Sequence, residues 1–143
     1  MIQIDLLPGE TFGDALDRIF GKDTMDALRA TLKVRSAAWE AVIRKINIKY
    51  GCTLSVYTTA CPVQIVGRLH DGQAFYFRER WGEWEAGIGA SDELAHQAAF
   101  YIETPEGCFG WEGECQSEPS WMDVEEVAVT IISILREYNA RLN

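Results

Sequence analysis

The segment that most constrains the fold is residues 53–89, where apolar and polar residues alternate with the period of a β-strand. Four candidate strands follow one another along it: Thr53–Thr58, Val63–Leu69, Gln73–Arg80 and a segment with Trp84, Ala86 and Ile88. Asp71-Gly72, between the second and third, is a strong hairpin signal. A second turn is expected near Trp81-Gly82. The segment therefore predicts an antiparallel β-meander, which we expect to comprise about four to six strands.

The third candidate strand has two chemically different faces. Alternation places Phe75, Phe77 and Glu79 on one face, and Tyr76, Arg78 and Arg80 on the other. The first face suits a core. The second combines an aromatic ring with two cations, so it could line a pocket for an anionic ligand.

Helical periodicity precedes the meander. Thr11 stands three residues before Asp14, which predicts a capping box for a helix that Gly21 ends. From Met25 to Tyr50, apolar residues are spaced three and four apart. This spacing permits one long helix, but the alternation at 31–35 also permits a break, with Ser36 capping a second helix.

Further elements are expected before and after these segments. A short strand is predicted over Ile2–Leu6 at the start of the chain. After the meander we expect a helix over Asp92–Ala99 capped by Ser91, a hairpin pairing Phe100–Glu103 with Cys108–Glu114, and a last helix that begins at Ser120. The last helix carries a wide apolar stripe from Val124 to Leu142 and should pack deeply against the sheet. The prediction is a single α+β domain over 1–143, with the meander packed against N-terminal helices and a long C-terminal helix.

Length and composition exclude several classes of protein. The chain has 143 residues, 48% of them hydrophobic, and no apolar run of the roughly 20 residues that span a bilayer. The start of the sequence does not resemble a signal peptide. A formal net charge of −9 argues against direct nucleic-acid binding. We expect a cytoplasmic protein that binds neither a membrane nor nucleic acid.

The charge is divided between two opposed regions. Residues 18–49 hold eight basic and three acidic residues, whereas residues 79–126 hold thirteen acidic residues and one basic residue, Arg80. The two regions could neutralise each other or be separate solvated faces. The alternative is that the acidic region attracts a partner with a basic surface.

Aromatic residues favour the second interpretation. Four of the five tryptophans lie in or beside the acidic stretch: Trp81, Trp84, Trp111 and Trp121. Tryptophan is enriched at the centres of interfaces, although a small domain also needs large residues for its core. The same region holds Phe100, Tyr101 and Phe109. We expect about half of these seven aromatic side chains to be buried.

No catalytic or metal-binding motif stands out. The cysteines Cys52, Cys61, Cys108 and Cys115 are spaced too widely for a zinc knuckle, and we expect reduced thiols without metal, obligatory disulfides or cofactor. The two histidines have no obvious nucleophile beside them. Glu83 and Glu85 could form a paired-carboxylate site, but such pairs are common on exposed strands. Nothing in the sequence indicates an enzyme.

One segment resembles proteins of a known origin. The segment from Phe75 to Gly89, with Tyr-Phe-Arg in its first strand and Gly and Trp before its second, is similar to small uncharacterised proteins of phages and bacterial mobile elements. The resemblance covers about a fifth of the chain and implies no catalytic residue. It implies a genomic neighbourhood rather than an activity. It also suggests an anti-defence role, because small acidic phage proteins often occupy basic, nucleic-acid-binding surfaces of host defence machinery, as anti-CRISPR proteins do.

Three hypotheses follow. The first is a non-enzymatic inhibitor that covers a basic, nucleic-acid-binding surface of a host protein. Its anchors would be Trp81, Trp84 and Trp111, and its charged groups would be Glu83, Glu85, Glu112 and Glu114. The second is a small-ligand module or minor enzyme that uses Tyr76, Arg78 and Arg80 in a pocket between the sheet and the last helix. The third is a self-associating protein, a homodimer, that uses the same aromatic surface on itself.

Overall fold

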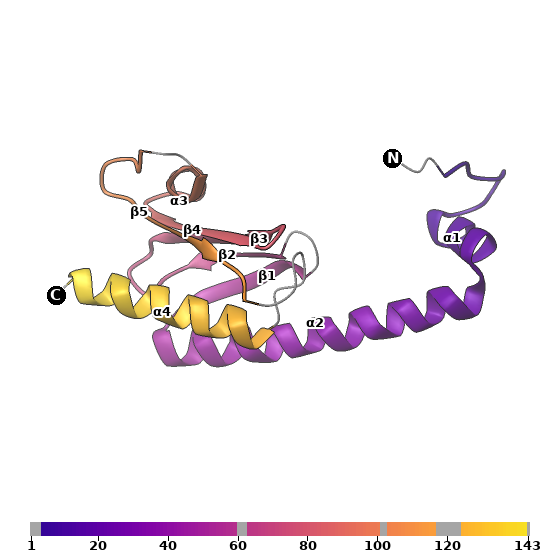
Figure 1. Ribbon diagram of the computed structural model, residues 1–143, viewed down its shortest axis with the longest axis horizontal. Helices are drawn as coiled ribbons and strands as arrows, with labels where there is room; N and C mark the ends of the chain where they lie inside the picture. Colours follow the sequence, from indigo (N-terminus) through magenta and orange to yellow (C-terminus); the bar gives the residue numbers. More distant parts are fainter. Residues whose placement is uncertain (1–3, 60–62, 101–102, 117–123, 143) are drawn as a thin grey trace. The chain divides into compact units, whose positions relative to one another are not determined.

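A computed structural model describes residues 4–59, 63–100, 103–116 and 124–142 (Figure 1). Within these ranges the chain forms four helices and five strands. In chain order they are α1 (Phe12–Phe20), α2 (Lys22–Tyr50), β1 (Thr53–Thr59), β2 (Val63–Arg68), β3 (Ala74–Arg80), β4 (Glu83–Gly89), α3 (Asp92–Phe100), β5 (Phe109–Glu114) and α4 (Val124–Leu142). The chain divides into two compact units, 1–37 and 38–143. The single domain over 1–143 stays a prediction.

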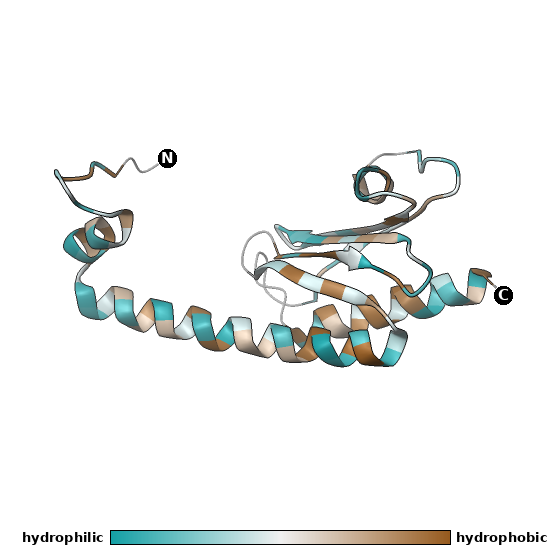
Figure 2. Cartoon of the chain, turned by 180° about the vertical axis from the view of Figure 1, so that it is seen from behind, coloured by the Kyte–Doolittle hydropathy of each residue, from teal (hydrophilic) through white to brown (hydrophobic). Residues whose placement is uncertain are grey.

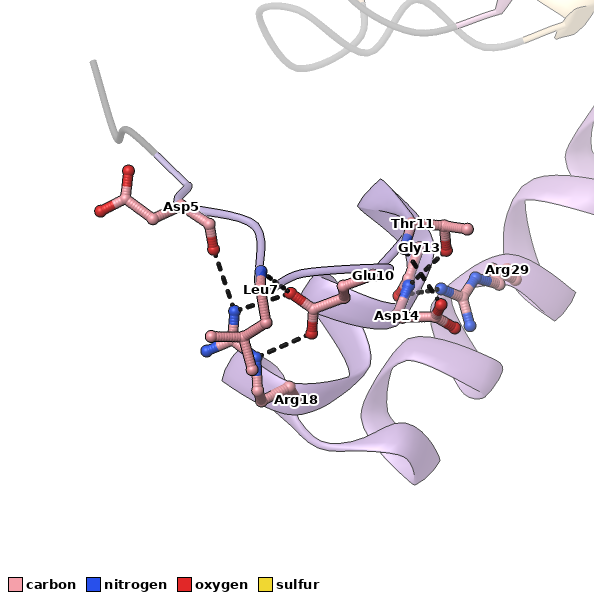
Figure 3. Close-up of polar contacts among 8 residues, drawn as sticks. All are labelled: Asp5, Leu7, Glu10, Thr11, Gly13, Asp14, Arg18 and Arg29. Carbon is pink, nitrogen blue, oxygen red and sulfur yellow. Dashed lines mark hydrogen bonds and ion pairs between the residues drawn. The ribbon is translucent and has the colours of Figure 1, made fainter.

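The first unit begins with the predicted capping box. Asp14 N–H donates to Thr11 Oγ1, and Thr11 N–H donates to the Asp14 carboxylate, both at 3.1 Å (Figure 3). Gly21 ends α1 with φ 91°, a conformation that glycine tolerates, and its N–H donates to Asp17 O. The capping box and the C-cap are thus confirmed. The described part of the predicted N-terminal strand, residues 4–6, is irregular, and residues 1–3 lie outside the described ranges.

Polar contacts hold this unit together. Arg18 donates to the Glu10 carboxylate and to Asp5 O, and Arg29 reaches Gly13 O at 3.3 Å (Figure 3). Arg29 also pairs with Asp17 at 2.9 Å. Among the described residues of the unit, only Ala15 and Met25 are buried. Larger apolar side chains are about half exposed: Leu6, Leu7, Phe12, Ile19, Phe20 and Leu28.

The helix α2 is continuous from Lys22 to Tyr50, so the long helix is the correct alternative and there is no break at Ser36. Thr31, within the suspected break, donates its hydroxyl to Ala27 O inside the helix. Brown and teal residues alternate along α2 in Figure 2. Its last turns contribute Trp39, Ile43 and Ile46 to the core of the second unit.

The second unit is built on the predicted meander. The five strands are antiparallel and lie in chain order, β1-β2-β3-β4-β5, which confirms the α+β class and the long C-terminal helix. The turn at Asp71-Gly72 is closed by Leu69 and Gln73, and Gly72 has φ 84°. Tyr138 of α4 donates its hydroxyl to the Asp71 carboxylate, which ties the helix to this turn.

One face of the sheet carries the core. Phe75, Phe77 and Ile88 are buried there against α4 and the last turns of α2 (Figure 1). The helix α4 supplies five buried residues: Val127, Ile131, Ile134, Leu135 and Tyr138. The buried stripe of α4 is narrower than predicted, because the Val129 side chain is 65% exposed and the Leu142 side chain is 50% exposed. Ser120, the predicted cap of this helix, lies outside the described residues.

The opposite face is covered by α3, which packs on β3, β4 and β5 (Figure 1). Glycines in the strands permit this close approach. A Cβ on Gly87 would lie 1.9 Å from Ala95 O, and one on Gly110 would lie 2.4 Å from Ala98 O. Leu94 N–H donates to Ser91 Oγ, so the predicted cap of α3 is confirmed.

The predicted partner of β5 is different among the described residues. Strand β5 pairs with β4, from Glu83↔Glu114 to Ile88↔Phe109. Phe100, which the prediction placed in a strand, is the last residue of α3, where its ring contacts Tyr76. Residues 101–102 of the predicted strand lie outside the described residues. An apolar residue at position 100 did not distinguish a strand from the end of a helix.

Candidate functional site: the acidic face of β4 and β5

Four glutamates lie on the α3-facing side of the sheet and form two rows across three strands. Glu83 is the cross-strand partner of Arg80 on β3 and of Glu114 on β5. Glu85 is likewise the partner of Arg78 and of Glu112. We call Glu83, Glu85, Glu112 and Glu114 the acidic face. Together with Trp84 and Gly113 they line a hollow of ≈ 400 Å³.

The rows place like charges directly opposite each other. Cross-strand partners have Cβ atoms about 4.5–5.5 Å apart, and like charges in that arrangement destabilise a sheet. Among the described residues, the basic cross-strand partners of these glutamates are Arg78 and Arg80, both on β3, and the two glutamates of β5 have no basic cross-strand partner. A face of this kind attracts cations or a cationic surface.

Arg78 is held from two sides. Its Nε lies 3.9 Å from Glu85 Oε2, and its guanidinium lies 4.5 Å from the centre of the Phe100 ring. Glu85 Oε2 is buried without a hydrogen-bond partner among the described residues. Burial raises the pKa of Glu85, Arg78 lowers it, and Glu83 and Glu112 raise it further, with a net rise. The charged form of Glu85 is therefore disfavoured at this position.

Trp81 stands beside this face at the tip of the β3–β4 turn. Its side chain is 66% exposed, and its φ of 59° lies in the left-handed region, which costs a non-glycine residue about 1–2 kcal/mol. Gly82 N–H donates to Oε1 of the fully buried Glu79 at 3.2 Å, which holds the turn. The Arg80 guanidinium lies 5.6 Å from the Trp81 ring. The turn thus presents a large aromatic ring to solvent.

The structure does not bring Trp84 and Trp111 to the acidic face. Both belong to the core side of the sheet, where each is half-buried. Trp84 stacks on Phe77, and Trp111 Nε1–H donates to Glu137 on α4 at 3.0 Å. Residues alternate along a strand, so the Trp84 side chain faces away from Glu83 and Glu85, although Trp84 also borders the hollow that the four glutamates line. Trp121 lies outside the described residues.

The predicted ligand residues do not lie between the sheet and the last helix. Tyr76 and Arg78 are on the opposite face, against His96 and Phe100 of α3, and the three residues do not share one pocket. Tyr76 lines a groove with Arg68, whereas Arg78 and Arg80 are not among the residues that line it. Arg68, Tyr57 and His96 belong to this groove and were missed in the sequence. Alternation gave a weak signal for Arg68, since it places Gln64, Val66 and Arg68 on one face of β2 and Val66 is the cross-strand partner of Tyr76. It gave the same signal for Tyr57, which faces away from the core-side Leu54 and Val56.

The described cysteines are free thiols in surroundings that do not favour the thiolate at Cys115. Cys52, Cys108 and Cys115 are free thiols, and Cys61 is outside the described ranges. Burial, followed by the nearby Glu79 and Glu126 carboxylates, raises the pKa of Cys115 to about 12, so its nucleophilic thiolate form is disfavoured. Among the described residues, no group of three His, Cys, Asp or Glu side chains is arranged to hold a metal ion.

Comparisons with known proteins add no relative. No family model, curated protein or solved structure matches the chain. In the part of the chain that the structure describes, none of the helices has the length and apolar character needed to cross a membrane.

Proposed function

We propose that this chain is a non-enzymatic binding module whose acidic face and Trp81 dock on a basic surface of a protein partner. The observation that carries the proposal is the pair of like-charged rows, Glu83↔Glu114 and Glu85↔Glu112. Facing carboxylates lower the stability of the fold. Two such pairs on one face are therefore better explained by a binding role than by a contribution to folding. A complementary cationic surface would remove the repulsion on binding.

Trp81 supports the same proposal. An aromatic residue that is largely exposed and held in a strained turn is a recurrent feature of binding sites. The ring supplies contact area, and the adjacent carboxylates steer the encounter. Trp84 and Trp111 contribute by shaping the sheet beneath, not as anchors.

The resemblance of the 75–89 segment to phage and mobile-element proteins gives the proposal a more specific form. In that form the partner is a host defence protein, the covered surface is one that binds nucleic acid, and the outcome is inhibition, as with anti-CRISPR proteins. The acidic face supports this form because a carboxylate-rich surface competes for the same cationic groups that contact phosphate.

Capture of partners from a host lysate tests the proposal. The bait proteins are the parent chain, Trp81→Ala, Glu112→Lys/Glu114→Lys and a matched control, Glu103→Lys/Glu106→Lys. The control reverses two exposed glutamates outside the acidic face, so its net charge equals that of the test variant. We expect a basic protein that the parent and control retain and that the other two lose. Equal retention by all four would refute the acidic face as the binding surface.

A further inference from the structure

A second site lies on the same side of the sheet, beside α3. The helix α3 packs on β3, β4 and β5. Beyond it, residues of β1, β2 and β3 and the first half of α3 enclose a groove of ≈ 520 Å³. This volume is within the range of small-molecule sites, about 300–1,000 Å³.

Two tyrosines give the groove aromatic walls. Tyr76 is fixed in place, because its hydroxyl accepts a hydrogen bond from Gln64 Nε2 at 3.1 Å and its ring packs edge-on against His96 at 4.9 Å. Tyr57 is 73% exposed. One wall is therefore preorganised, and the other has a ring surface left uncovered.

Alternation along β1 places Tyr57 on the groove side of the sheet, because Leu54 and Val56 pack into the core on the other side. A β-bulge interrupts the ladder at this residue: Val56 pairs with Ile65 and Thr58 pairs with Gln64, so Tyr57 is the extra residue. A bulge bends its strand, and bulges are frequent beside binding sites.

The polar groups of the groove are electrically balanced. Arg68 Nη2 and Asp92 Oδ1 form an ion pair at 3.2 Å, with the side chains 45% and 82% exposed. The pair offers hydrogen-bond donors and acceptors side by side, and Gln64 adds an amide oxygen. In a chain of net charge −9, such a pair suits an uncharged ligand better than an anion.

We propose that this groove binds a small molecule with a flat, uncharged heteroaromatic ring, the chemistry of a nucleobase, stacked between Tyr57 and the Tyr76–His96 pair. The ring edge bonds to Arg68, Asp92 and Gln64. This site is separate from the acidic face and goes beyond the binding of a protein partner.

The full-length chain is titrated with adenosine, guanosine, cytidine and uridine up to millimolar concentrations, and amide chemical shifts are recorded. Ribose serves as the non-aromatic control. We expect at least one nucleoside, and not ribose, to shift the resonances of residues 57, 68, 76 and 96. No shift with any of the four nucleosides, or equal shifts with ribose, would overturn the proposal. A single-stranded oligonucleotide should bind more weakly than the nucleoside, and tighter binding would assign the groove to nucleic acid instead.

Variants then assign the contacts. Tyr57→Ala should weaken nucleoside binding roughly fivefold or more, the usual effect of removing a stacked ring, whereas Tyr57→Phe should retain it. Arg68→Gln should weaken it about tenfold through loss of charged hydrogen bonds. Phe12→Ala, an exposed aromatic side chain on α1, is the control and should bind nucleoside as the parent does. Thermal melts by circular dichroism verify folding. Unchanged affinity in folded Tyr57→Ala would contradict the proposed stacking.

Discussion

Glu85 and Glu112 face each other across β4 and β5 as cross-strand partners, and neither β5 glutamate has a basic cross-strand partner. Glu83 and Glu114 repeat the arrangement one pair further along. Such pairs oppose folding, so their removal should stabilise the chain. This sets the acidic face apart from a solvated surface in which acids are separated by neutral or basic residues.

Glu112→Gln should raise the free energy of unfolding by roughly 0.2–1 kcal/mol, because it removes one member of a facing like-charged pair. Urea denaturation at low salt measures the change. The gain should shrink at high salt, where repulsion between exposed charges is screened. Glu106→Gln, at an exposed loop position, is the control and should leave stability unchanged. A loss of stability in Glu112→Gln would show that its carboxylate makes a favourable contact.

The stability of the chain should also depend on the protonation of Glu85. Its pKa is raised in the folded state, chiefly by burial. Its contribution is therefore favourable below the pKa of an unfolded glutamate, about 4.3, and is lost as the pH rises through the folded value. Glu85→Gln should accordingly be more stable than the parent at pH 7, with a difference that shrinks as the solution is acidified below that range. Denaturation over a pH series measures it. If the stabilisation of Glu85→Gln relative to the parent grew on acidification, the pKa of Glu85 would be lowered by folding, which would contradict the prediction.

Gly87→Ala should lower the free energy of unfolding by about 2–3 kcal/mol through overpacking. The added Cβ would lie 1.9 Å from Ala95 O and would force α3 away from the sheet. Gly13→Ala is the matched control: it lies in α1, where the nearest atom is 3.7 Å away, and alanine favours a helix. The control should be neutral or stabilising. Thermal denaturation of both variants measures these effects. An unchanged melting temperature for Gly87→Ala would mean that α3 does not pack this closely on the sheet.

The sequence predicted the sheet well because alternation, turn residues and caps all pointed to the same elements. Asp71-Gly72, Thr11 with Asp14, and Ser91 each do locally what their chemistry indicates. The sequence does not determine whether α2 is continuous, since a helical spacing and a short alternating run coexist at 31–35.

The partner surface was only partly predictable. Tryptophans and glutamates were grouped by their closeness in the sequence, but alternation along β4 puts Trp84 on the opposite side from Glu83 and Glu85. The same alternation, applied to the acidic segment, would have separated core tryptophans from exposed acids. The pairing of Glu112 with Glu85 could not be read from the sequence, because it depends on how β5 returns to β4 after α3. The bulge at Tyr57 is a tertiary feature of the same kind.

The central claim is that the acidic face steers a basic partner, and the association rate constant tests it most directly. It is measured for the captured partner with the parent chain and with Glu112→Lys/Glu114→Lys, each at low and high salt. The variant should fold, because each lysine would face a glutamate on β4. The account predicts fast parent association that slows with salt, and slow variant association that depends little on salt. A variant that associates at the parent rate at both salt concentrations would contradict it.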